Sequence, residues 1–200
     1  MENIKEIIKN QKQFYQTGRT RSYEFRMQAL DRLEKVIIRQ EDAIKKALKK
    51  DLHKSSFESY MTEIGMICNE ITYAKQNLKK WMKPKKNRAP LAQFPSKCFQ
   101  VYEPYGVVLI TAPWNFPFLL SLQPLVGAIA AGNCCIIKPS EYAPASANVL
   151  KKILSMVFPQ KYICAILGGK RTSQELLDQP LDHIFFTGSV SVGKIVMEKA

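Results

Sequence analysis

Three short segments of this 200-residue chain carry side chains or glycines that could bind and activate a ligand. The first is residues 112–117 (APWNFP), in which the carboxamide of Asn115 is a neutral N–H donor. Such a donor can stabilise negative charge that develops on a carbonyl oxygen. The residues by themselves favour a second interpretation, in which Asn115 caps a helix that begins at Pro117. Trp114, beside it, could wall a cleft or could simply be buried.

The other two segments could hold the sugar and phosphates of a nucleotide. Lys138 and Glu141, three positions apart, could hydrogen-bond both hydroxyls of a ribose, or they could form an exposed ion pair of little energetic value. Residues 188–193 (GSVSVG) have glycines at both ends, and free N–H groups at a helix start can hold a pyrophosphate, with a hydroxyl added by Ser189. This pattern lacks the GxGxxG spacing, so it is weak evidence when taken alone.

Each of these segments follows a short apolar run that predicts a β-strand. Strands are expected at residues 106–112, 133–138, 162–167 and 183–187, and helices at residues 144–158, 172–179 and 191–200. Strands that are apolar throughout and alternate with helices predict an α/β fold with a parallel sheet covered on both faces. Such sheets bind ligands at the carboxyl ends of their strands.

Residues 1–82 predict a helical segment in front of this sheet. Apolar residues recur at helical spacing in two series: Met27, Leu30, Leu33, Ile37, Ile44 and Leu48; and Tyr60, Ile64, Ile67, Ile71, Ala74, Leu78 and Met82. In the second series we expect Glu63, Glu70, Lys75 and Lys79 to face outward. No glycine or proline lies between residues 19 and 65, so a polar turn such as residues 54–56 must separate the helices.

A basic linker and a strand at the sheet edge are expected at residues 83–103, followed by a cofactor-binding domain at 104–200. Lysine and arginine crowd around Pro84 and Pro90, which is typical of a solvated connector. A nucleic-acid patch is the alternative, but aromatic side chains for base stacking do not alternate with the basic ones. Residues 97–103 alternate in polarity, which predicts the strand.

The composition indicates a globular chain without a metal site. Apolar residues make up 46% and charged residues 24%, and 30 basic against 17 acidic residues give a net charge of +13. Such a surplus fits nucleic acid, an acidic membrane surface, or a chain that lacks its acidic half. The two histidines lie far apart, and the five cysteines show no CxxC spacing, which indicates reduced thiols.

No targeting or membrane-spanning segment is expected. The longest apolar stretch, residues 116–131, is interrupted by Pro117 and Pro124 and is shorter than the ~20 residues that cross a bilayer. The reduced thiols and the lack of such a segment together predict a cytoplasmic protein with no membrane partner.

The three segments in this order resemble the aldehyde dehydrogenase superfamily, especially its class 3 branch and bacterial relatives. The resemblance includes residues 51–54 (DLHK) and 60–63 (YMTE), and the Pro-Trp-Asn-Phe-Pro run is its most specific element. It implies a Rossmann-like, NAD-binding domain that oxidises an aldehyde to a carboxylate. It also implies a homodimer in the full-length protein, with NADP as a possible alternative cofactor.

The resemblance also implies a role for each candidate site residue. Asn115 would be the catalytic donor that supplies half of an oxyanion hole. The dinucleotide would be held by Trp114, Lys138, Glu141, Gly188, Ser189 and Gly193. Glu141 would repel a 2′-phosphate, which favours NAD over NADP.

The family reaction also needs a thiolate nucleophile and a carboxylate base, and neither is found where the family places it. None of the five cysteines follows Gly188 and Ser189, and a Glu-Leu-Gly-Gly segment is absent. We therefore expect a chain truncated before the catalytic domain and inactive by itself. Two alternatives stay open: a non-catalytic remnant or interaction subunit of this fold, and a basic nucleic-acid-binding module.

Overall fold

The computed structural model describes residues 3–200. Its α-helices are α1 (Ile4–Gln16), α2 (Tyr23–Arg39), α3 (Glu41–Leu52), α4 (Ser56–Ser59), α5 (Gly65–Trp81), α6 (Leu119–Ala131), α7 (Pro144–Val157), α8 (Lys170–Leu177) and α9 (Val190–Lys199). Single turns of other helix types are η1 (Arg19–Arg21), η2 (Tyr60–Ile64) and η3 (Leu91–Gln93). The helical segment expected before residue 82 is therefore present, and its helices α3 and α4 are separated by the expected polar turn.

Four parallel strands form the central sheet in the order β5-β4-β3-β6. They are β3 (Val107–Thr111), β4 (Cys134–Lys138), β5 (Ile163–Ala165) and β6 (His183–Phe186). All five residues of β4 are buried, whereas β6 at the edge alternates between exposed and half-buried positions. The predicted α/β fold with a parallel sheet is confirmed, and each strand lies inside its predicted range.

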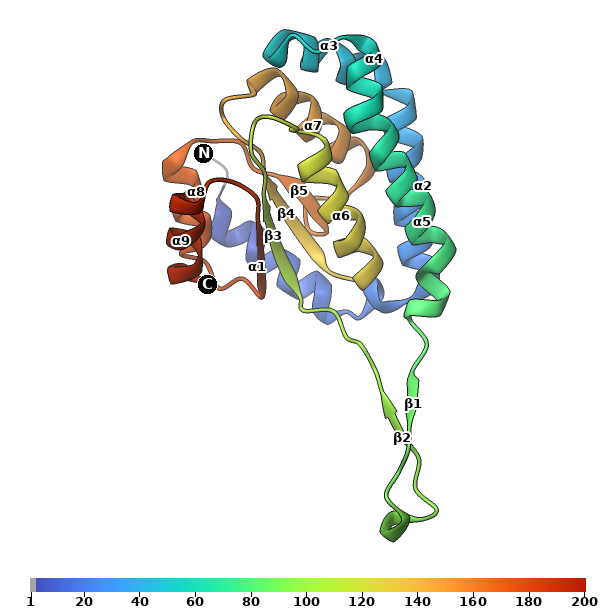
Figure 1. The fold of residues 1–200 in the computed structure, drawn as a ribbon. Helices are drawn as coiled ribbons and strands as arrows, with labels where there is room; N and C mark the ends of the chain where they lie inside the picture. Colours follow the sequence, from blue (N-terminus) through green and yellow to red (C-terminus); the bar gives the residue numbers. More distant parts are fainter. Residues whose placement is uncertain (1–2) are drawn as a thin grey trace.

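Helices cover the sheet in layers (Figure 1). Helix α6 connects β3 to β4 and packs on both, and α7 connects β4 to β5 and packs on β5. Helix α1 packs on β3 and β4, and Figure 1 places it with α8 and α9 on the side away from α6 and α7. The chain leaves β5 at one edge of the sheet and forms β6 at the other edge, beside β3. A right-handed crossover in this direction places α8 on the same face as α1.

A second helical layer lies outside α6 and α7. Helix α2 packs on both of them, α5 packs on α6, and α3 packs on α7. The apolar faces of this layer are buried, including Leu30, Leu33, Ile37, Ile67 and Ile71, each 0% exposed. Helices α2, α3 and α5 are therefore built onto the two helices that follow β3 and β4, whereas α1 packs directly on the sheet.

One turn of this segment departs from the predicted register. Residues Tyr60–Ile64 form a π-helical turn, in which the N–H of Gly65 donates to the carbonyl of Tyr60. A π turn holds more residues per turn than an α-helix, so it rotates the side chains that it contains. Tyr60, expected inside, is 44% exposed, and Glu63, expected outside, is 0% exposed. The expectation for these two residues was wrong.

The strand expected at the edge of the main sheet lies elsewhere. Strand β2 (Cys98–Gln100) pairs antiparallel with β1 (Lys85–Asn87) in a separate two-stranded sheet. We call residues 85–100, which are the two strands and the loop between them, the hairpin arm. It projects away from the body, as Figure 1 shows, and both of its strands are exposed. Alternating polarity predicts a strand but not its partner, and here the partner is the lysine-rich run itself.

Candidate functional site

The parallel register brings the three candidate segments to one edge of the sheet. Thr111, the last residue of β3, is paired with Lys138 of β4 and with Phe186 of β6. Backbone hydrogen bonds continue just beyond the strands, because Ala112 N donates to Lys138 O (3.2 Å) and Thr187 N donates to Thr111 O (3.1 Å). The turns that carry Asn115, Glu141 and Gly188 therefore all begin at the carboxyl ends of neighbouring strands.

Asn115 does not cap helix α6. The helix begins at Leu119, and its first amides are taken by Glu63, whose Oε2 accepts from Phe118 N (2.8 Å) and Leu119 N (3.1 Å). The Asn115 side chain is exposed, and its carboxamide makes no hydrogen bond to any residue in the range 3–200. The capping interpretation is therefore wrong, and the carboxamide is available to a ligand. Trp114, which precedes it, is 50% exposed.

A buried ion pair lies directly beneath the Asn115 turn. Lys54 and Glu63 are 7% and 0% exposed, and Lys54 Nζ donates to Glu63 Oε1 at 2.7 Å. The same ammonium donates to the backbone carbonyl of Asn115 at 3.0 Å and lies 4.0 Å from the centre of the Phe116 ring. The helical segment thus holds the turn through one lysine and one carboxylate.

Lys138 and Glu141 contact each other, as the ion-pair interpretation expected, but only one member of the pair is exposed. Their Nζ and Oε2 atoms are 2.9 Å apart, with Lys138 4% exposed and Glu141 exposed. Desolvation by burial raises the pKa of Glu141, but the hydrogen bond from Lys138, a backbone hydrogen bond and the attraction of the ammonium together lower it. The carboxylate is therefore ionised at neutral pH, with its outer side open to a ligand.

The turn that carries these two residues is also held by the helical segment. Helix α7 begins at Pro144, and the Asp51 carboxylate accepts from Ala145 N (3.1 Å) and Ser146 N (2.7 Å) at its first turn. A carboxylate at a helix start is favoured because it satisfies free N–H groups and the helix dipole. Asp51 and Glu63 therefore cap the two helices that leave the candidate site.

Residues 188–193 also have structural roles, in packing against Phe186 and in capping α9. A Cβ at Gly188 would lie 2.5 Å from Cζ of the Phe186 ring, so any other residue here would force that ring to move. Ser189 caps α9, with its Oγ accepting from Val192 N (3.4 Å). At Gly193 a Cβ would meet the same ring at an ordinary 3.4 Å. A pyrophosphate at this helix start stays a prediction.

The three cysteines in the strands of the main sheet are poorly suited to act as nucleophiles. None of the five cysteines forms a disulfide, and Cys134, Cys135 and Cys164 are buried. Desolvation by burial raises the pKa of Cys134 to about 12 and raises that of Cys135 well above its usual value. Since the thiolate is the reactive form, these cysteines are structural.

We expect a thiol reagent to separate one cysteine from the other four. At pH 8 the Cys134 thiolate would be about one part in 10⁴, and burial also blocks access, whereas Cys98 is exposed. Titration of the native chain with a chromogenic disulfide should give one fast thiol, abolished by Cys98→Ser, and all five in denaturant. Rapid reaction of Cys134 in the native chain would contradict this assignment.

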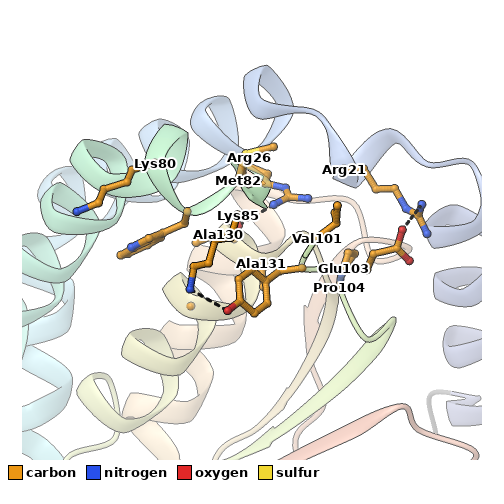
Figure 2. A pocket seen from close by; sticks show the side chains of 13 residues that line it. Arg21, Arg26, Lys80, Met82, Lys85, Val101, Glu103, Pro104, Ala130 and Ala131 are labelled. Atoms are coloured by element: carbon orange, nitrogen blue, oxygen red, sulfur yellow. Dashed lines mark hydrogen bonds and ion pairs between the residues drawn. The ribbon is translucent and has the colours of Figure 1, made fainter. Parts of the chain in front are cut away.

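A cavity lies away from this edge, where the hairpin arm meets the body (Figure 2). It has a volume of about 690 Å³ and is lined by Arg21, Arg26, Lys85 and Glu103 among others. Figure 2 shows Arg21 pointing toward Glu103, with which it forms a 3.6 Å ion pair. Its wall includes Pro104, just before the amino end of β3, so this cavity is not continuous with the candidate site.

Comparison with known proteins decides the family. The family model described as "Aldehyde dehydrogenase family" matches residues 1–200. The chain belongs to the aldehyde dehydrogenase family. Family 3 member B1 from Rattus norvegicus is 42% identical over 200 residues, which are 100% of this chain and 43% of that protein. The resemblance to the class 3 branch is confirmed.

Solved aldehyde dehydrogenases share the fold. The substrate-bound state of Staphylococcus aureus AldH superposes with a TM-score of 0.97 at 45% identity, covering 100% of this chain and 44% of that one. A betaine aldehyde dehydrogenase from the same species, in complex with NAD⁺, gives 0.87 at 25% identity, covering 100% and 41%. The chain thus spans 40–44% of the length of its first curated aldehyde dehydrogenase relatives.

The side chains that hold the site were not predicted from the sequence. Asp51, Lys54 and Glu63 belong to the two segments that resemble the aldehyde dehydrogenases, but Lys54 was expected in a polar turn and Glu63 on an outer helix face. The signal in the sequence was only their place in those two segments, because regular helical spacing puts Glu63 on the outer face. Only the structure shows that both carboxylates reach helix starts 55 and 94 positions later. Within residues 3–200, no cluster of metal-ligating side chains and no helix suited to crossing a membrane is found.

Proposed function

We propose that this chain supplies the cofactor cradle and the oxyanion donor of an NAD-dependent aldehyde dehydrogenase that yields a carboxylate. The observation that carries the proposal is the free carboxamide of Asn115, at the same sheet edge as the Lys138–Glu141 pair. Family membership supports the reaction class. The aldehyde itself stays undefined, since the residues that this segment contributes indicate only an apolar entrance.

The residues present fit a dinucleotide. When bound, NAD accepts a hydride from the substrate. Glu141 keeps an ionised, exposed carboxylate that can accept from one ribose hydroxyl, while the Lys138 ammonium, 2.9 Å away, can donate to a neighbouring oxygen. The exposed face of Trp114 and the glycine turn at Gly188 would flank this pair.

Asn115 would act on the substrate. Addition of a nucleophile to an aldehyde carbonyl places negative charge on its oxygen, and a fixed N–H donor lowers the energy of that charged state. The carboxamide cannot titrate, so it donates at every pH of interest. The nucleophile and the base that releases the acid would come from outside these 200 residues.

Tests of this function need a protein that contains both halves. We define the completed enzyme as residues 1–200 followed by the remaining part of the Staphylococcus aureus relative, which is 45% identical over this chain. It should form NADH from NAD⁺ and simple aldehydes, and the product should be the carboxylic acid. A folded completed enzyme that binds NAD⁺ but oxidises no aldehyde would support the alternative of a non-catalytic interaction subunit.

The same proposal includes a homodimer in the cytoplasm. The hairpin arm exposes large apolar side chains, with Leu91 96% and Phe94 86% exposed. Exposed apolar patches commonly mark protein–protein contacts. The absence of disulfides among the five cysteines supports a reducing compartment.

Glu141 should determine the choice between the two nicotinamide cofactors. We expect Glu141→Gln in the completed enzyme to raise the ratio of NADP to NAD efficiency by about tenfold, since about 1.4 kcal/mol of removed repulsion corresponds to that factor. The reason is that the ionised carboxylate would face a 2′-phosphate. Steady-state kinetics with both cofactors measures the ratio, and Glu175→Gln on α8 is the control. An unchanged ratio would mean that Glu141 does not contact the ribose.

A further inference from the structure

Two charged residues are buried beneath the Asn115 turn at a position where neither touches a ligand-binding atom of the proposed site. Their side-chain hydrogen bonds go to each other, to the Asn115 carbonyl and to the first amides of α6. Glu63 accepts from Lys54 through Oε1 and from Phe118 and Leu119 through Oε2. Lys54 donates to Glu63 and to Asn115 O, and its ammonium also faces the Phe116 ring.

Local backbone geometry places both residues. Helix α3 ends at Leu52, and His53 takes the left-handed conformation (φ 55°), which reverses the chain directly before Lys54. Glu63 is turned inward by the π-helical turn Tyr60–Ile64. A non-glycine residue at positive φ and a π turn are both costly, and such features persist mainly where function or packing requires them.

The cost of this arrangement indicates that stability is not its purpose. Taking a lysine and a glutamate out of water carries a desolvation penalty that their attraction often fails to recover, and well-packed apolar residues are often at least as stable. What the pair does provide is a fixed position for one backbone carbonyl. The carbonyl is the backbone carbonyl of Asn115, whose side chain makes no hydrogen bond within the described part of the chain.

We propose that Lys54, supported by Glu63, is a positioning residue that orients the Asn115 carboxamide for oxyanion stabilisation. This proposal rests on the proposed function. Lys54 fixes the carbonyl and the neighbouring Phe116 ring, while Glu63 fixes the start of α6, so the peptide between them has little freedom. The carboxamide is then held on a rigid turn although it makes no contact of its own.

The test is a double-mutant cycle in the completed enzyme. Lys54→Met removes the bond to Asn115 O and leaves Glu63 on the α6 amides. We expect the single-turnover acylation rate at saturating NAD⁺ to fall by about tenfold or more, because misplacement by about 1 Å can cost about 100-fold. NAD⁺ affinity should not change. In an Asn115→Ala background, Lys54→Met should have no further effect, since it acts only through that carboxamide.

A matched lysine provides the control. Lys75 on α5 forms ion pairs with Asp31 and Glu34 in the same helical segment but does not touch the turn. Lys75→Met should leave acylation unchanged. If Lys54→Met fails to fold because Glu63 loses its partner, the double variant Lys54→Met/Glu63→Gln removes both charges and should show the same slow acylation.

The outcomes separate this proposal from the proposed function. If Asn115→Ala leaves acylation unchanged, the oxyanion role itself is wrong. If Asn115→Ala slows acylation but Lys54→Met does not, or if the two effects multiply, Lys54 is a structural residue and the positioning proposal is overturned. A slow Lys54→Met enzyme with normal NAD⁺ affinity and no added loss in the Asn115→Ala background supports it.

Discussion

Asn115→Ala in the completed enzyme is expected to slow acylation by about 10²–10³-fold, the usual loss when one oxyanion-hole donor is removed. The reason is that the carboxamide lies exposed at the carboxyl end of β3 and has no structural hydrogen bond among residues 3–200 that its removal would break. Folding and NAD⁺ affinity should therefore be retained. Rapid-quench measurement of acyl-enzyme formation under single-turnover conditions isolates this step.

A charged substitution makes the same test more specific. Asn115→Asp keeps the size of the side chain but places a carboxylate where negative charge develops, so its rate should be at least as low. Asn77→Ala on α5 is a suitable control, because that amide contacts only the Tyr73 carbonyl of its own helix. A normal acylation rate in Asn115→Ala would show that Asn115 does not stabilise the oxyanion. Because the structure excludes the capping role, neither proposed role would then remain.

The 200-residue chain alone is expected to oxidise no aldehyde and to self-associate. We expect no thiol to attack an aldehyde at the site, because the three cysteines of the main sheet are buried and burial raises the pKa of Cys134 and Cys135. The exposed Cys98 lies on β2 of the separate hairpin. Association should follow from apolar surface near the end of the chain, where Phe185 of β6 is 42% exposed and Ile195 and Met197 of α9 are 52% and 80% exposed. An open apolar strand edge next to exposed apolar side chains favours intermolecular pairing.

Light scattering after size-exclusion chromatography tests the expected self-association. An NADH assay with one aromatic and one short aliphatic aldehyde tests the expected lack of activity. A monodisperse monomer with cooperative thermal unfolding would contradict the expected association. NADH formation that is lost on substitution of Cys134 or Cys135 would contradict the absence of a nucleophile. In the completed enzyme, the same surfaces should be covered, and association through β6 should disappear.

The sheet could be predicted because its signal is local. Each strand is a short run of buried apolar residues, and a parallel sheet places the turns after such runs at one edge, so the positions of Asn115, Lys138 and Glu141 followed from the order of segments alone. The contact between Lys138 and Glu141 was one of two interpretations of their spacing, and the burial of Lys138 was not expected from it.

The supports of the site could not be predicted because they depend on distant contacts and on one irregular turn. Regular helical spacing placed Glu63 on the outside, and only the π turn at Tyr60–Ile64 brings it in. The strand at residues 98–100 was recognised, but its partner in the lysine-rich run was not, because pairing is set by the hairpin and not by composition.

The two carboxylate caps have a consequence for synthesis on the ribosome. Asp51 and Glu63 emerge 94 and 55 positions ahead of the amides that they accept from. Until those amides appear, both acids must remain hydrated, and the apolar faces of α2, α3 and α5 have no α6 or α7 to cover them. Domains that fold as independent units can do so as they emerge, but this helical segment lacks its packing partners at that stage. Residues 1–82 and the sheet should therefore fold as one cooperative unit, and nascent chains released before α7 is made should be substrates for chaperones.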